Sequence, residues 1–255
     1  MYVPYADTFA ALLPAELSQA TGRKVDMQNL PTGSPYFTHR EFQDALALKP
    51  DTILWVLTSN DMNSVISFRF PTRAPSLLDR IRKNLRSPIL LENLMLQSPA
   101  QTVMQYAKGT VNESVMVNPS SAWQAQLKEL DAMIGDLAVQ AEGNGAKLVL
   151  AYIPERPVAI MLTMHEHPAG MDPWKPGRDV EAMARRHGAV YIDLESALSR
   201  FTAPGTLYYP VEGHLNAKGQ AFFAPYLAQG FLDEGLIAKD SRQNTSIDLA
   251  TVRRK

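Results

Sequence analysis

The run TILWVL at residues 52–57 decides the fold class of this chain. It is apolar throughout, so it predicts a strand that is buried on both faces, as the strands of parallel sheets are. Polar residues follow at once, in the segment TSND at residues 58–61. Two later runs have the same apolar character, KLVLAYIP at residues 147–154 and AVYIDL at residues 189–194. A shorter run at residues 25–30 predicts one more strand.

Amphipathic segments separate these strands. Apolar side chains at helical spacing predict helices over residues 7–21, 39–48, 120–143, 179–187 and 217–232. In the first of these helices Asp7 is the expected N-cap and Gly22 the expected end, while Pro14 predicts a kink or a later start. Strands that alternate with helices predict a parallel sheet with helices on both faces, a three-layer α/β/α, flavodoxin-like domain.

The chain of 255 residues is long enough for one sizeable core. Residues 1–239 are expected to form a single domain, with a helical insertion at residues 63–118 that holds amphipathic segments near 77–85 and 90–106. The polar stretch at residues 240–255 has the composition of a disordered tail. The insertion is a candidate lid or substrate wall.

Composition narrows the function classes. A formal net charge of −1 argues against nucleic acid or an anionic membrane as the main partner. The absence of cysteine excludes disulfides, zinc–thiolate sites and a thiol nucleophile. No apolar run reaches the length of a membrane span, and the composition leaves the compartment and the oligomeric state open.

A candidate catalytic loop lies near the C-terminus, in YYPVEGHLN at residues 208–216. Glu212 stands two residues before His214 on a loop that contains proline and glycine. A carboxylate so placed can hold an imidazole in one tautomer while the other ring nitrogen accepts a proton from a nucleophile. Gly33, Asn60 and residues 155–156 also follow predicted strands, where doubly wound sheets form their sites.

Three segments together resemble the SGNH hydrolases, the GDSL-type esterases and acyltransferases. They are NLPTG at residues 29–33, KPD at 49–51 with its strand and SND at 59–61, and EGHLNAKG at 212–219. They occur in the order of the family and cover nearly the whole chain. The resemblance implies a serine-dependent hydrolysis or transfer of an acyl ester, on a small-molecule or carbohydrate substrate, without a metal or organic cofactor.

The resemblance also implies residue roles. His214 would be the general base and Glu212 its orienting acid, where the family usually has aspartate. The backbone N–H of Gly33 and the side-chain amide of Asn60 would donate to the oxyanion, for which a neutral amide is well suited.

The family's nucleophile is the serine of a Gly-Asp-Ser motif, and this motif does not occur in the chain. In relatives, the stretch that resembles YVPYADTF at residues 2–9 comes shortly after that serine. We therefore expect the serine and the first strand to be encoded upstream of Met1, and the 255-residue chain alone to be poorly stable or inactive. Ser34 and Ser59 lie near the expected site, but neither follows the strand-to-helix elbow that exposes a nucleophile.

The sequence also allows other functions. A non-catalytic SGNH-like binding protein, or a pseudoenzyme that has lost its serine, would keep the same fold. A nucleotide-binding or regulatory domain is a further alternative, although the chain has neither Gly-x-Gly-x-x-Gly nor a Walker-type lysine loop. The HEH triplet at residues 165–167 could suggest a metal, but its Pro/Gly surroundings favour a solvated loop.

Overall fold

The computed structural model describes residues 3–30, 39–59, 61–62, 98–108, 113–211 and 213–238. Within these ranges three strands form one parallel sheet in the order β1-β2-β3: β1 at Thr52–Thr58, β2 at Lys147–Ile153 and β3 at Val190–Ile192. Thr52 pairs with Lys147, and Val149 pairs with Val190. The predicted α/β fold with a parallel sheet is confirmed.

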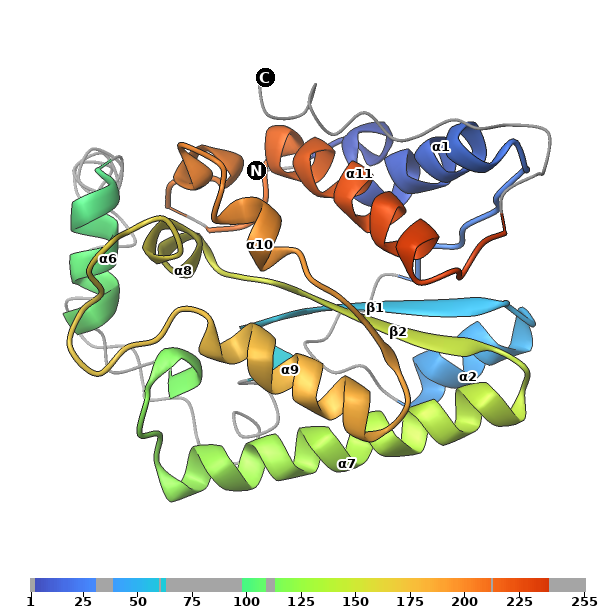
Figure 1. The fold of residues 1–255 in the computed structure, drawn as a ribbon, viewed down its shortest axis with the longest axis horizontal. Coiled ribbons are helices and arrows are strands. Elements are labelled where there is room, and N and C mark those ends of the chain that lie inside the picture. Colours follow the sequence, from blue (N-terminus) through green and yellow to red (C-terminus); the bar gives the residue numbers. More distant parts are fainter. Residues whose placement is uncertain are drawn as a thin grey trace, which may run out of the picture.

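Eight α-helices lie in the same described ranges. They are α1 at Phe9–Thr21, α2 at His39–Ala47, α6 at Pro99–Lys108, α7 at Ser121–Gly143, α8 at Arg156–Met161, α9 at Lys175–Arg186, α10 at Glu195–Leu198 and α11 at Ala217–Asp233. Helices α1 and α11 pack side by side over one face of the sheet, while α2, α7 and α9 cover the other face (Figure 1). This arrangement is compatible with three α/β/α layers.

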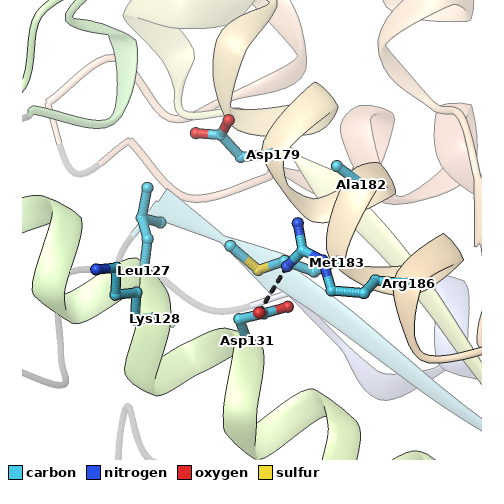
Figure 2. Close-up of a pocket in the computed structure, with 7 residues that line it drawn as sticks. All are labelled: Leu127, Lys128, Asp131, Asp179, Ala182, Met183 and Arg186. Carbon is cyan, nitrogen blue, oxygen red and sulfur yellow. Dashed lines mark ion pairs between the residues drawn. The ribbon is translucent and has the colours of Figure 1, made fainter.

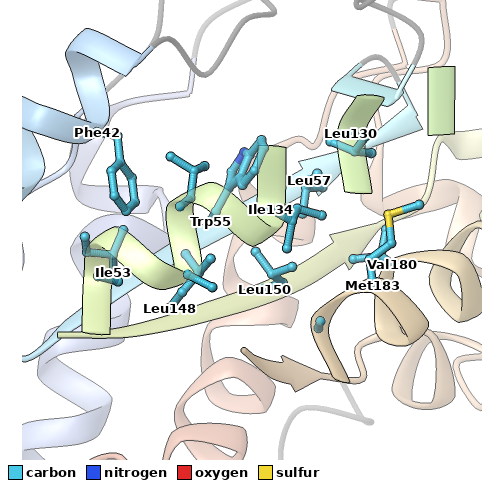
Figure 3. Close-up of a cluster of buried hydrophobic side chains, with 14 of the residues drawn as sticks. Phe42, Ile53, Trp55, Leu57, Leu130, Ile134, Leu148, Leu150, Val180 and Met183 are labelled. Atoms are coloured by element: carbon cyan, nitrogen blue, oxygen red, sulfur yellow. The ribbon is translucent and has the colours of Figure 1, made fainter. Parts of the chain in front are cut away.

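Two of the three hydrophobic clusters in the described residues lie on opposite faces of the sheet, and the third joins α6 to α8. Ile53, Trp55 and Leu57 of β1 point toward α7, where Leu130 and Ile134 meet them (Figure 3). The opposite core joins Val149 and Ala151 of β2 to α1, α10 and α11. Burial of apolar side chains on both faces fixes the sheet between the helices.

The prediction that β1 is buried on both faces is wrong. Its side chains alternate between buried and half-buried, because Leu54 and Val56 are only partly covered on the α1/α11 face. β2 is instead buried at six of its seven positions, as a strand with a neighbour on each side should be. The apolar run at residues 147–154 therefore corresponds to the central strand of the described sheet.

The long helices agree with the sequence pattern. α7 begins after Ser120, whose Oγ accepts a hydrogen bond from Trp123 N at 3.1 Å. α1 ends at Gly22, which has a φ of 70°. Its start is Phe9 with Thr8 as N-cap, so the prediction of Asp7 as N-cap is wrong; Asp7 ends a short 3₁₀ turn, Tyr5–Asp7.

Other predicted elements differ from the structure. Residues 25–30 form no strand, and Val25 N donates to Ser18 Oγ at 3.0 Å. α9 starts four residues earlier than predicted, with Pro176 in its first turn. The short helices α8 and α10 were not predicted at all.

The insertion is described only in part. α6 is the described portion of the helix expected near residues 90–106. The helix expected near residues 77–85 and the tail at 240–255 lie outside the described residues. No described helix is both long enough and apolar enough to cross a lipid bilayer.

Candidate functional site

The carboxyl ends of the three strands meet at one edge of the sheet, as they must in a parallel arrangement. Ser59 follows β1, residues 154–156 follow β2 and lead into α8, and residues 193–195 follow β3 and lead into α10. In Figure 1 this is the edge from which the chain passes into α8. Polar side chains from separate parts of the sequence therefore converge here.

The loop that carries His214 is closed by its own backbone. Tyr208 and Leu215 form an isolated antiparallel bridge, and Tyr209 N donates to His214 O at 2.8 Å. Gly213 N donates to Tyr209 O at 3.0 Å, and Gly213 adopts a φ of 80°, which glycine tolerates best. The loop is a compact turn, and the side chain of His214 is exposed on it.

Asn216 fixes the junction between this loop and α11. Its Oδ1 accepts from Gly219 N at 3.0 Å, which caps the helix. Its Nδ2 donates to Thr206 O at 2.9 Å and to Tyr208 O at 3.2 Å. One side chain thus ties Thr206 and Tyr208 to the first turn of α11.

Two side chains fasten the loop to the carboxyl end of β2. Tyr208 Oη donates to Pro154 O at 2.8 Å, and its pKa is raised above the ordinary value by burial and by the carboxylate of Glu155. Arg156 Nη1 donates to Pro210 O at 3.0 Å, and Arg156 Nε donates to Gly205 O at 3.2 Å. The loop of His214 is therefore bound to the residues that directly follow β2.

Of the four residues predicted to form the site, only His214 lies within the described residues. Gly33, Asn60 and Glu212 lie outside them. The convergence of all four thus stays a prediction. The flanks of Asn60 are described: Ser59 and Asp61 follow β1, and Thr58 donates to Asp61 Oδ2 from both N and Oγ1 at 2.7 Å.

Ser59 is completely buried, and its Oγ lies 2.6 Å from the phenol oxygen of Tyr152. A hydroxyl in this position does not meet solvent, so a substrate does not reach it. This geometry agrees with the sequence argument against Ser59 as a nucleophile. Ser34 lies outside the described residues.

A buried carboxyl group lies near the end of β3. Glu195 is 3% exposed, and burial, with a smaller contribution from the neighbouring Asp193, raises its pKa to about 9. Glu195 Oε1 has no hydrogen-bond partner among the described residues. The group is therefore protonated at neutral pH. Nothing in the sequence pattern singled it out.

The described residues contain no group of three or more His, Asp or Glu side chains that could hold a metal ion. Residues 165–167, the HEH triplet, are all exposed, as a solvated loop would be. A shallow hollow of about 180 Å³ lies between α7 and α9, with Leu127 and Met183 among its lining residues (Figure 2). Arg186 and Asp131 form a 2.6 Å ion pair across it. Its lining comes from these two helices and contains no residue that follows a strand.

Sequence reasoning noted that Arg156 follows a strand, but it gave this residue no role. The three acceptors of its guanidinium lie about 50 residues away in the chain, in segments that no local pattern connects. A charged pair, Glu155 and Arg156, close behind the apolar run that ends at Ile153 is the signal that could have marked it.

Comparison with known proteins finds no matching family model, no matching curated protein and no matching solved structure.

Proposed function

We propose that this protein is a serine-dependent ester hydrolase or O-acyltransferase of the SGNH type, acting on a small-molecule or carbohydrate ester. One observation carries the proposal. The loop of His214 is bound through Tyr208 and Arg156 to the carboxyl end of β2, the edge at which parallel sheets form their sites. His214 is exposed on this loop.

In this proposal His214 removes the proton of the nucleophilic hydroxyl and later returns it to the leaving group. Glu212 accepts a hydrogen bond from the other ring nitrogen and keeps the tautomer fixed. Gly33 and Asn60 donate hydrogen bonds to the oxyanion of the tetrahedral intermediate. The nucleophile in this proposal is the serine of the family's Gly-Asp-Ser motif, which residues 1–255 do not contain.

The test begins with the coding DNA upstream of Met1. A frame that encodes a hydrophobic strand and Gly-Asp-Ser supports the proposal, and the extended protein is then treated with a fluorophosphonate probe. We expect the probe to label that serine. His214→Ala should reduce esterase turnover by about 10²–10⁴-fold, the usual contribution of a general base. His187→Ala, at the C-terminal end of α9, is the matched control and should leave turnover unchanged.

The second candidate is a non-catalytic binding protein with the same fold. It is favoured by the absence of Gly-Asp-Ser from residues 1–255 and by the complete burial of Ser59. If the upstream frame is closed, or its product resists the probe, hydrolysis is excluded. Carbohydrate binding then becomes the next assay.

A further inference from the structure

Arg156 joins three separate segments through one guanidinium. Its side chain is 5% exposed and lies at the start of α8. Nε donates to Gly205 O at 3.2 Å, while Nη1 donates to Pro210 O and to Thr102 Oγ1, each at 3.0 Å. Thr102 belongs to α6, Gly205 to the 3₁₀ turn Pro204–Leu207, and Pro210 to the loop of His214.

Only arginine can make this set of contacts. Its planar fork presents several N–H donors in fixed directions, whereas lysine has a single nitrogen at the end of a flexible stem. Burial lowers the pKa of Arg156 from its ordinary value, but the group stays charged. Charge-assisted hydrogen bonds to three oxygens offset the loss of water around this cation.

The contact with Pro210 governs the outer half of the loop. Tyr208 attaches the base of the loop to Pro154, whereas Pro210 lies further out, four residues before His214. The backbone bonds from Tyr209 to His214 and from Gly213 to Tyr209 make this part of the loop one unit. A shift of Pro210 therefore moves His214 as well.

We propose that Arg156 is a positioning residue that holds His214 at the carboxyl end of β2 and couples it to α6. The catalytic consequence rests on the proposed function, while the mechanical role does not. α6 lies within the expected insertion at residues 63–118. The side chain of Arg156 links Thr102 of α6 to Pro210 of the His214 loop, so a displacement of α6 can reach the loop through it.

Amide hydrogen exchange tests the mechanical role in the full chain. In Arg156→Ala the amides of Tyr209 and Gly213 should exchange about tenfold faster. The loop then lacks a charge-assisted hydrogen bond, and this loss should raise the equilibrium constant for its local opening about tenfold. Amides in the middle of α7 should keep their rates. Unchanged exchange at Tyr209 and Gly213 would overturn the proposal.

Three comparisons make this result specific. Arg200→Ala is the matched control, because Arg200 is exposed and donates to the carbonyl of Ser196. This variant should leave exchange in the His214 loop unchanged. Added guanidinium at a non-denaturing concentration should restore the slow rates in Arg156→Ala and urea should not. If Arg156→Ala does not fold, Arg156→Lys replaces it, and its single nitrogen should still give faster exchange than the native protein.

A kinetic measurement on the upstream-extended protein tests the catalytic consequence. Arg156→Lys should lower kcat about tenfold with little change in KM, because the base is displaced while the substrate contacts remain. An equal loss in Arg200→Ala, or a change in KM alone, would contradict positioning. If no variant turns over an ester, the proposed function fails, and the exchange experiment still decides whether Arg156 holds the loop.

Discussion

Ser59 and Tyr152 share a hydrogen bond in the interior, where neither oxygen meets water. Removal of one partner leaves the other buried and unsatisfied, which costs about 1–3 kcal/mol. Tyr152→Phe should therefore lower the free energy of unfolding by this amount, as measured by urea denaturation. The double variant Ser59→Ala/Tyr152→Phe should lose less than the sum of the two single variants, since it leaves no orphaned hydroxyl. Strictly additive losses would mean that the bond does not couple the two residues.

Among single residues, the sequence pattern made His214 a candidate general base, because Glu212 and a Pro/Gly loop surround it, and this role stays a prediction. It could not assign Arg156 or Tyr208. Their acceptors, Pro210 for the one and Pro154 for the other, lie 54 residues away along the chain. Such pairs form only when the sheet brings distant segments together, so a local pattern carries no sign of them.

α9 and α10 approach each other at a glycine. A Cβ placed on Gly177 would lie 1.6 Å from Glu195 Oε2, so any side chain there must push Glu195 away. Gly177→Ala should lower the free energy of unfolding by about 1–3 kcal/mol through overpacking, measured by thermal and urea unfolding. In the double variant Gly177→Ala/Glu195→Ala, removal of the Glu195 side chain should restore part of the stability that Gly177→Ala loses.

Gly143→Ala is the control for the same substitution. Gly143 ends α7, and a Cβ there would meet nothing within 4 Å. This variant should be neutral or stabilised by up to about 1 kcal/mol, because alanine loses less backbone entropy in a helix. Equal destabilisation at both glycines would show that close packing at Gly177 is not the cause.

The long elements followed from the sequence because periodicity needs length to be visible. α7 and α11 repeat their apolar stripes over several turns, whereas α10 spans four residues and gives no period. The strand predicted at residues 25–30 was wrong for another reason. A strand exists only where a neighbour accepts its hydrogen bonds, and its own residues do not encode that neighbour.

The buried carboxyl of Glu195 makes the stability of the whole molecule depend on pH. Its pKa is about 9 in the folded protein, against the usual 4.5 of an exposed glutamate. The folded state thus keeps a proton that the unfolded chain releases, and this group's contribution to stability falls as the pH rises from about 4.5 to 9.

Urea unfolding across this pH range measures the effect. Glu195→Gln mimics the protonated side chain. The urea concentration at its unfolding midpoint should therefore fall less than that of the native protein as the pH increases. Glu129→Gln, on the exposed face of α7, is the control and should follow the native curve. Parallel curves for all three proteins would rule out Glu195 as the cause.

The parallel α/β organisation could be predicted at the scale of the molecule, because apolar strands alternate with amphipathic helices. The degree to which each strand is covered could not be predicted from the same pattern. The runs of β1 and β2 are equally apolar, yet only β2 is enclosed on both faces. Coverage depends on where α1 and α11 lie, which is a property of packing and not of the strand itself.

The spacing of the paired strands along the chain predicts an order of assembly. β1 meets β2 across 95 residues of chain (52 to 147), while β2 meets β3 across 41 (149 to 190). The entropy of closing the longer loop exceeds that of the shorter by about 0.7 kcal/mol, before any difference in loop stiffness. The β2–α9–β3 unit should therefore gain protection first in pulse-labelled refolding, and β1 should join afterwards. Earlier protection of β1 would reverse this order. In this order, the carboxyl ends of β2 and β3 come together before the end of β1 joins them. Of the described sheet, the β1 side of the candidate site is then the last part to become native.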